Sequence, residues 1–306
     1  MPKAYVFTRY GGPETEALAE QDKPVPGPGE LLVAVRAAGV NPVDWKLRTG
    51  YVRPGSEPQP FPTVFGSEAA GTVEAVGPDT EGFAVGDEVF GNPVTGGYAE
   101  YTLMPVAVTA HKPAGLSFTD AATLPVAAAT AYDAIHQLDL AAGATLLITG
   151  GGGGVGSAAI QLARHRGVRV VGVASPAKKE FVESLGAVHV ASGPGLAERV
   201  REAAPEGVDA VVDLVGGDTL RAAAALLDDP ADLIGIGDKQ LVVELGGAAV
   251  RRARTAAVLE ALARLTEDGV LRTHVDRTYP LTRAGDALRA VEQGHARGKT
   301  VIEVAR

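Results

Sequence analysis

The 306-residue chain contains no cysteine, which excludes disulfide bonds and every metal site built on thiolates. It has no long Lys/Arg block and carries a formal net charge of −9, so neither nucleic acid nor an anionic membrane surface is expected as a main partner. No apolar run approaches the length that spans a bilayer, and the start, MPKAYVFTRY, lacks the apolar core of a signal peptide. These absences predict a cytoplasmic protein.

What the chain does have is apolar residues, glycine and proline. Apolar residues make up 46% and charged residues 21%, which is enough for a substantial core, and the length suits one large domain or two ordinary ones. The 39 glycines and 20 prolines are spread along the chain as turn signals. Ordered domains are therefore expected throughout.

The stretch 145–163, TLLITGGGGGVGSAAIQLA, is the most informative part of the sequence. A short apolar strand pattern leads into five glycines and then into a segment with helical spacing, and a second strand is expected at 168–174. The spacing Gly151-x-Gly153-x-x-Gly156 fits the dinucleotide fingerprint, in which glycines allow a tight turn, close approach of a pyrophosphate and helix–strand packing. A flexible linker is the alternative, but the ordered pattern of both flanks favours a binding turn.

The chain before residue 118 has mainly β texture. Asn41 is expected to cap a short helix that begins at Pro42 and stops at Gly50, and a proline-rich loop is expected at 51–62. Strands are predicted at 3–9, 31–38, 70–76, 87–90 and 98–103.

From Ser117 the pattern changes to an alanine-rich helical region that runs to about residue 138, with a break at Pro125. Strands and helices then alternate, which is typical of a parallel sheet. The predicted strands are 188–191, 210–214 and 233–236, and the predicted helices are 196–204, 220–227 and 256–265. The end of the chain returns to β texture, with a strand at 273–278, a helix at 282–292 and a strand at 300–304.

Nine segments of the chain, taken together and in order, resemble the medium-chain dehydrogenase/reductase superfamily and within it the zinc-free quinone oxidoreductase-like branch. They are AAGVNPVDWKLRTG (37–50), FPTVFGSEAAGTVEAVG (61–77), FAVGDEVFG (83–91), GGYAEY (96–101), LPVAAATAYDAI (124–135), LLITGGGGGVGSAAIQLAR (146–164), SLGA (184–187), VDAVVDLVGG (208–217) and GKTVIEV (298–304).

The resemblance implies an α/β protein with a GroES-like, β-rich catalytic domain and an inserted Rossmann domain with a doubly wound parallel sheet. We place the catalytic domain at 1–118 and 267–306 and the dinucleotide-binding domain at 119–266, with the active site expected in the cleft between them. In the zinc-bearing relatives a cysteine and a histidine occupy the positions of Asn41 and Ser67. Neither replacement is a zinc ligand of that kind, and Glu68 alone does not make a site, so no metal is expected.

Without a Lewis acid, the expected chemistry is hydride transfer from a nicotinamide to an already electron-poor carbon, as in a quinone or an α,β-unsaturated carbonyl compound. By resemblance, Asn41 and Thr130 lie near the nicotinamide, and Tyr51 is placed to donate a hydrogen bond to the developing oxyanion. The remaining residues expected to bind the dinucleotide are Gly151, Gly153, Gly154, Val155 and Gly156 at the turn, and Leu214, Val215, Gly216, Ile236 and Gly237 beside the ring.

The cofactor is predicted to be NADPH. The strand 168–174 ends in Ser175-Pro-Ala-Lys178-Lys179, with no carboxylate before Glu180. A carboxylate here would bind the ribose hydroxyls of NADH, whereas a hydroxyl and two ammonium groups attract a 2′-phosphate. The alternative is that both lysines are solvated surface residues.

Several of these residues also have a purely structural interpretation. Asn41 also serves as a helix cap, Thr130 as an ordinary helix residue and Tyr51 as an exposed loop residue. Asp44 and Lys46 are expected to form a local surface pair without a catalytic role. The histidines at 136, 165 and 295 are expected on helix surfaces.

Two other functions stay open at this stage, an enoyl-thioester reductase of a biosynthetic pathway and a non-catalytic NADPH-binding regulatory protein of the same fold. At 42–44 the chain reads Pro-Val-Asp, where the enoyl reductase modules of polyketide synthases carry Tyr or Phe followed by Arg-Asp. A homodimer acting on a small, electron-poor molecule is expected.

Overall fold

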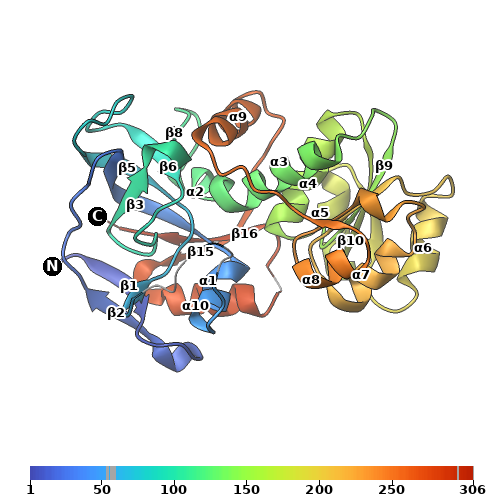
Figure 1. Cartoon of the computed structure of the whole chain (residues 1–306), viewed down its shortest axis with the longest axis horizontal. Helices are drawn as coiled ribbons and strands as arrows, with labels where there is room; N and C mark the ends of the chain where they lie inside the picture. The colour runs from blue at the N-terminus through green and yellow to red at the C-terminus, as the bar shows by residue number, and fades with distance from the viewer. Residues whose placement is uncertain (53–54, 56–59, 295, 306) are drawn as a thin grey trace. The chain divides into compact units, whose positions relative to one another are not determined.

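The computed structural model describes residues 1–52, 55, 60–294 and 296–305. The predicted loop at 51–62 therefore lies partly, and His295 wholly, outside the described residues. The chain forms two compact units (Figure 1). The first unit comprises Met1–Val126, Arg254–Glu267 and Val275–Arg306, and the second comprises Ala127–Ala253 and Asp268–His274.

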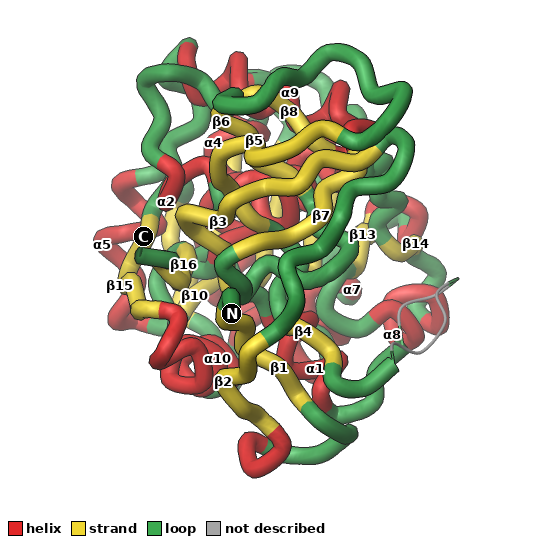
Figure 2. Tube along the Cα trace, turned by 90° about the vertical axis from the view of Figure 1, so that its left-hand side faces the viewer, coloured by secondary structure: helices red, strands yellow, loops and turns green. Residues whose placement is uncertain are grey.

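The first unit is organised around the long strand β3 (Glu30–Val40), which is buried along most of its length. β3 pairs antiparallel with β5 (Ala69–Val76) on one side and with the C-terminal strand β16 (Lys299–Glu303) on the other. β7 (Tyr101–Pro105) also pairs with β3. Figure 2 shows these strands side by side, so the last strand, β16, lies in one sheet with strands from the first part of the chain. The sheet order is β15 (Val275–Pro280), β16, β3, β5, β6 (Glu88–Gly91) and β8 (Thr109–His111).

A smaller sheet and four helices complete the first unit. The sheet has the order β2 (Glu16–Glu20), β1 (Lys3–Phe7) and β4 (Thr63–Val64). The helices are α1 (Pro42–Arg48), α2 (Phe118–Ala121), α9 (Ala256–Glu267) and α10 (Ala284–Glu292). Arg48, at the end of α1, is buried and forms ion pairs with Glu16 and Glu292, which ties α1 to β2 and α10.

The second unit contains a six-stranded sheet whose strands all run parallel, as the alternating pattern predicts. Its order is β11 (Val188–Ala191), β10 (Arg169–Ala174), β9 (Thr145–Thr149), β12 (Ala210–Asp213), β13 (Leu233–Gly235) and β14 (Ala248–Ala249). The connecting helices are α3 (Ala129–Leu138), α4 (Gly154–His165), α5 (Lys179–Ser184), α6 (Leu196–Ala203), α7 (Gly217–Ala224) and α8 (Lys239–Glu244). The α/β class and the Rossmann-like parallel sheet are confirmed.

The predicted break at Pro125 is also present. Residues Leu124–Ala128 form a π-helical turn between α2 and α3, because a proline removes one backbone donor from the helical ladder. The strand β2 and the short elements α8 and β14 were not predicted. They are five, six and two residues long.

The pairing of β3 with β5 requires a glycine at position 71. A Cβ atom there would lie 2.2 Å from the carbonyl oxygen of Ala34 and 2.8 Å from Cγ1 of Val33. Gly71→Ala should therefore lower the free energy of unfolding by about 1–3 kcal/mol, because the backbone of the central strand must move. Urea denaturation measures this loss.

Gly115→Ala is the matched control, since a Cβ atom at Gly115 meets no atom within 4 Å. This variant should be as stable as the wild type. Equal stability of both variants would show that β3 and β5 do not approach as closely as described.

Candidate functional site

The first helix begins at Asn41, as predicted, with Pro42 as its first residue. The Asp44 carboxylate accepts the backbone N–H of Asn41 at 2.9 Å, an exchange typical of a capping box. It also accepts the hydroxyl of Ser67 at 2.6 Å and that of Tyr98 at 2.9 Å. The prediction that Asp44 forms a surface pair with Lys46 is wrong, because Asp44 is fully buried and its oxygens face these three donors.

Tyr98 stays protonated beside Asp44. Burial, with the neighbouring carboxylate of Asp44, raises the pKa of the Tyr98 phenol well above its ordinary value. The hydroxyl can therefore only donate to Asp44 at physiological pH. This bond and the Ser67 bond fix the carboxylate at the start of α1.

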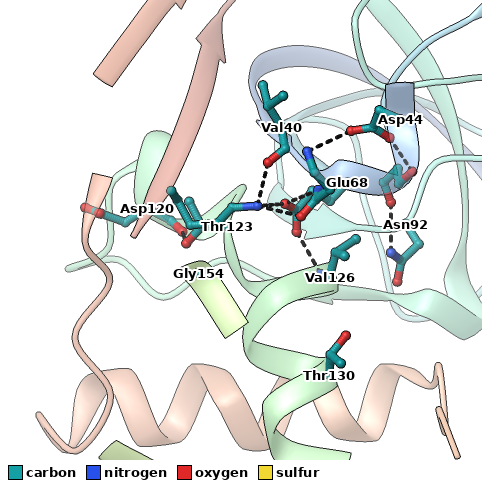
Figure 3. A network of polar contacts seen from close by, with 12 residues as sticks. Val40, Asp44, Glu68, Asn92, Asp120, Thr123, Val126, Thr130 and Gly154 are labelled. Carbon is teal, nitrogen blue, oxygen red and sulfur yellow. Dashed lines mark hydrogen bonds and ion pairs between the residues drawn. The ribbon is translucent and has the colours of Figure 1, made fainter. Parts of the chain in front are cut away.

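Glu68 and Lys299 form a buried ion pair next to Asn41. Figure 3 shows Glu68 in this network of polar contacts, between Val40 and Val126. The Lys299 ammonium donates to Oε1 of Glu68 and to Oδ1 of Asn41, each at 2.7 Å, and to the carbonyl oxygen of Val40 at 3.1 Å. Asn41 Nδ2 donates to Oε1 of Glu68 at 2.8 Å, and the backbone N–H of Val126 donates to Oε2 at 2.7 Å. The network thus joins the end of β3 to the C-terminal strand and to the turn at Val126.

This network admits a single orientation of the Asn41 side chain. An ammonium only donates and a carboxylate only accepts, so the amide oxygen must face Lys299 and the amide nitrogen must face Glu68. The amide nitrogen has two N–H groups, of which Glu68 takes one. The second N–H is left for another acceptor, with its direction set by the ion pair.

The Lys299–Glu68 ion pair also explains why residue 39 is a glycine. A Cβ atom at position 39 would lie 2.1 Å from Oε1 of Glu68 and 2.5 Å from the carbonyl oxygen of Ala122. Glycine is therefore needed in β3 at the point where the buried carboxylate crosses the strand.

An apolar pocket of about 280 Å³ lies in the first unit. Its described lining includes Phe7, Tyr10, Tyr51, Phe65 and Ser67, and no charged residue is among the lining residues that the structure describes. Tyr51 is 39% exposed and contributes to the wall of this pocket. Ser67 connects this pocket to Asp44 and so to the start of α1.

In the second unit, the glycine-rich stretch forms the predicted strand–turn–helix. Gly153 caps α4, so that Gly154, Val155 and Gly156 form the first turn of this helix. A Cβ atom at Gly156 would lie 2.4 Å from the carbonyl oxygen of Gly150, so a side chain would force the turn open. The first N–H groups of a helix have no partner within it and attract anions, so the turn fits a dinucleotide pyrophosphate.

Three loops converge at the carboxyl ends of β9, β12 and β13. A Cβ atom at Gly150 would lie 3.2 Å from Cβ of Leu214, and one at Gly237 would lie 2.9 Å from the backbone of Leu214 and Val215. The structure thus brings together the predicted groups 214–216 and 236–237 at the end of the glycine turn. Open parallel sheets bind their ligands at this edge.

Asp213 holds these loops in place. Its carboxylate accepts the hydroxyl of Thr149 at 2.6 Å and the backbone N–H of Gly216 at 2.8 Å. Burial raises the pKa of the Asp213 carboxyl, and the two hydrogen bonds oppose this effect.

The residues predicted to select the cofactor lie directly after β10. Ser175 is exposed and begins a 3₁₀ turn, Pro176–Lys178. The alkyl part of Lys178 packs against Gly152 in the glycine turn. The ammonium of the exposed Lys179 instead pairs with Glu183 at 3.0 Å. The family spacing counted back from Ser184–Ala187 likewise places the phosphate-binding lysine at Lys178, with Lys179 second.

Thr130 is buried in α3 and accepts a hydrogen bond from Arg252 at 2.5 Å. Arg252 also donates to Asp133 at 2.9 Å, and the same carboxylate oxygen accepts the backbone N–H of Ala253. Sequence reasoning did not find Arg252, because its partners Asp133 and Thr130 lie 119 and 122 residues away in the chain.

Lys299 was also missed, although it lies in the segment GKTVIEV that contributed to the resemblance. A lysine within an otherwise apolar strand pattern was the available signal, since a buried ammonium requires a buried partner. His136 and His165 are exposed on α3 and α4, as predicted.

Among the described residues, no group of three or more His, Cys, Asp or Glu side chains is arranged to hold a metal ion. No helix in the described part of the chain is long and apolar enough to cross a membrane.

The buried ion pair should contribute strongly to stability. Lys299→Met leaves the Glu68 carboxylate buried without its countercharge, which should lower the free energy of unfolding by about 3–5 kcal/mol. Adding Glu68→Gln to this variant removes the second charge and should restore part of the loss. Urea denaturation of both variants measures the difference.

Lys23→Met is the control, since the Lys23–Glu74 pair is exposed at 39% and 35% of its side-chain surfaces. It should leave stability nearly unchanged. A Lys299→Met variant that is as stable as Lys23→Met would contradict the burial of the Lys299–Glu68 pair.

Two family models match the chain. Residues 27–114 match the alcohol dehydrogenase GroES-like domain, and residues 185–302 match the model described as zinc-binding dehydrogenase.

Known proteins resemble the chain over nearly its whole length. The chloroplastic NADPH-dependent alkenal/one oxidoreductase of Arabidopsis thaliana is 34% identical, over 98% of this chain and 79% of the relative. The quinone oxidoreductase structure from Coxiella burnetii superposes with a TM-score of 0.89 at 30% identity, covering 99% of both chains. The CurK enoyl reductase structure gives a TM-score of 0.88 at 28% identity, again covering 99% of both. The chain has an NAD(P)-binding oxidoreductase fold and belongs to the medium-chain dehydrogenase/reductase superfamily, as an oxidoreductase of its zinc-free quinone oxidoreductase-like branch.

Proposed function

We propose that the protein reduces a quinone or an α,β-unsaturated carbonyl compound with NADPH and without a metal ion. This proposal rests on the hydrogen bonds that the side chains of Asn41 and Ser67 form. At the two positions where zinc relatives hold their metal, this chain places hydrogen-bonding side chains fixed by Glu68, Lys299 and Asp44. A site of this kind orients an acceptor but supplies no Lewis acid. The hydride acceptor that fits such a site is a molecule that is already electron-poor.

The pocket beside Ser67 supports the same substrate class. Its aromatic and uncharged described lining favours a planar, neutral molecule, and a volume of about 280 Å³ suits a small one. We propose Tyr51 and Asn41 as the catalytic residues of the first unit. Tyr51 donates a hydrogen bond to the oxygen on which negative charge develops.

Asn41 contributes through its second amide N–H, which the Lys299–Glu68 pair holds in a fixed direction. All three N–H groups of the Lys299 ammonium have acceptors, namely Val40, Asn41 and Glu68. We therefore assign Lys299 a positioning role and not that of the proton donor.

We propose that the second unit is the dinucleotide-binding domain and that the first unit is the catalytic domain. NADPH supplies the hydride when it is bound. The residues proposed to hold it are Asn41, Thr130, Gly151, Gly153, Gly154, Val155, Gly156, Ser175, Lys178, Lys179, Leu214, Val215, Gly216, Ile236 and Gly237. Arg252 joins this set as a positioning residue for Thr130, because it donates to the threonine hydroxyl.

The similarity to the CurK enoyl reductase favours an enoyl thioester as the second candidate substrate. A homodimeric state and a cytoplasmic location belong to the same proposal, and sedimentation of the purified protein tests the first of them.

The substrate class can be tested with NADPH and a panel of acceptors. A quinone or an enone should be reduced, and a saturated ketone should not, because only the former are electron-poor without a Lewis acid. A metal chelator should leave the rate unchanged. NADPH oxidation followed by absorbance measures these rates.

Turnover confined to enoyl thioesters would favour the second candidate. Tight NADPH binding without turnover of any acceptor would instead indicate a regulatory protein. Activity that is lost in chelator and restored by zinc would refute the metal-free mechanism.

The cofactor preference can be tested at Lys178. A hydrogen bond to a charged group contributes about 1.5–3 kcal/mol, so Lys178→Ala should weaken NADPH binding roughly tenfold to a hundredfold. NADH binding should stay nearly the same, because NADH has no 2′-phosphate. Fluorescence titration with both cofactors measures the effect. Equal affinity of the wild type for NADPH and NADH would contradict the proposed role of Ser175 and Lys178.

A further inference from the structure

Gly152 is a glycine that the dinucleotide fingerprint does not require. In the spacing Gly151-x-Gly153-x-x-Gly156 it occupies the first variable position. The structure nevertheless leaves no room for a side chain there. A Cβ atom at Gly152 would lie 2.5 Å from Cδ of Lys178, 3.2 Å from its Cβ and 3.4 Å from its Cγ.

The clash at Gly152 differs in kind from those at the neighbouring glycines. A Cβ atom at Gly156 would strike the backbone of Gly150 and Gly151 at 2.4–2.9 Å, and one at Gly151 would approach Cα of Gly172 at 3.3 Å. A Cβ atom at Gly153 would make only an ordinary contact, 3.5 Å from the carbonyl oxygen of Gly150. At Gly152 alone among these four, the obstacle is a charged side chain.

The path of Lys178 across the turn is set from its own side as well. β9 and β10 are paired in register up to Thr149 and Val173, so the glycine turn and the 3₁₀ turn leave adjacent strand ends. The backbone N–H of Gly151 donates to the carbonyl oxygen of Val173 at 2.9 Å, and that of Lys178 donates to Ser175 at 2.9 Å. With both backbones held, the alkyl chain of Lys178 lies over the Cα atom of Gly152.

We propose that Gly152 is a specificity-determining residue, whose missing Cβ atom lets Lys178 lie across the glycine turn and serve the 2′-phosphate of NADPH. This inference rests on the NADPH preference proposed above. A methyl group at position 152 displaces the lysine stem. It leaves the backbone of the turn in place, because the far end of a flexible side chain yields more easily than a strand or a helix.

The test compares Gly152→Ala with the wild type by calorimetric titration of 2′,5′-ADP and of 5′-AMP, which differs from it only in lacking the 2′-phosphate. The variant should bind 2′,5′-ADP about tenfold more weakly, the loss expected for one hydrogen bond to a charged group, and 5′-AMP as the wild type does. Thermal unfolding of the ligand-free protein should be unchanged. Gly115→Ala, in open space, is the control and should alter neither affinity nor unfolding.

A double-mutant cycle assigns the effect to Lys178. If Gly152 acts through this lysine, Gly152→Ala should have no further effect on 2′,5′-ADP binding in a Lys178→Ala background. Additive losses would overturn the inference, as would an equal loss of 5′-AMP binding, which would indicate damage to the turn itself. Retained selectivity in Gly152→Ala alongside lost selectivity in Lys178→Ala would overturn the inference and leave the proposed cofactor intact. A wild type that does not distinguish the two ligands would refute the cofactor preference, and the inference with it.

Discussion

The first unit depends on one buried charge pair, Lys299 with Glu68. A buried carboxylate or ammonium is stable only when paired and hydrogen-bonded, so each of these side chains dictates where the other must lie. The pair fixes the register of β16 against β3, the position of Asn41 and the need for glycine at position 39. Because Asn41 is the N-cap of α1, the same pair also fixes where this helix begins. The start of α1 and the C-terminal strand are thus positioned by one ionic contact.

The second unit follows a different constraint, namely the absence of side chains. Glycines at 150, 156 and 237 allow backbone segments from three loops to approach one another at the ends of parallel strands. A Cβ atom at Gly156 or Gly237 would come within 3.0 Å of backbone atoms, and one at Gly150 would lie 3.2 Å from Cβ of Leu214. Polar anchors such as Asp213 then hold the loops at the required spacing. Glycine is the residue with the least conformational preference, yet these glycines lie in a well-defined turn, because the parallel sheet fixes the segments on either side of them.

Elements with a local signal could be predicted from the sequence. The glycine turn, the cap at Asn41 and the parallel strands each depend on residues that are close in the chain. Lys299 and Arg252 could not be assigned, because their partners lie 258 and 119 residues away. Asp44 was misplaced for another reason. Its spacing from Asn41 is that of a capping box, which predicts a carboxylate turned inward, but the charge alone was taken to indicate the surface.

The place of Lys299 in the order of synthesis has a consequence for folding. The strand that carries it is made after the whole of the second unit, whereas its partners Asn41 and Glu68 are made before that unit. During translation the early part of the first unit therefore holds an acidic side chain whose countercharge does not yet exist. The first unit can form this ion pair only after the second unit has been synthesised.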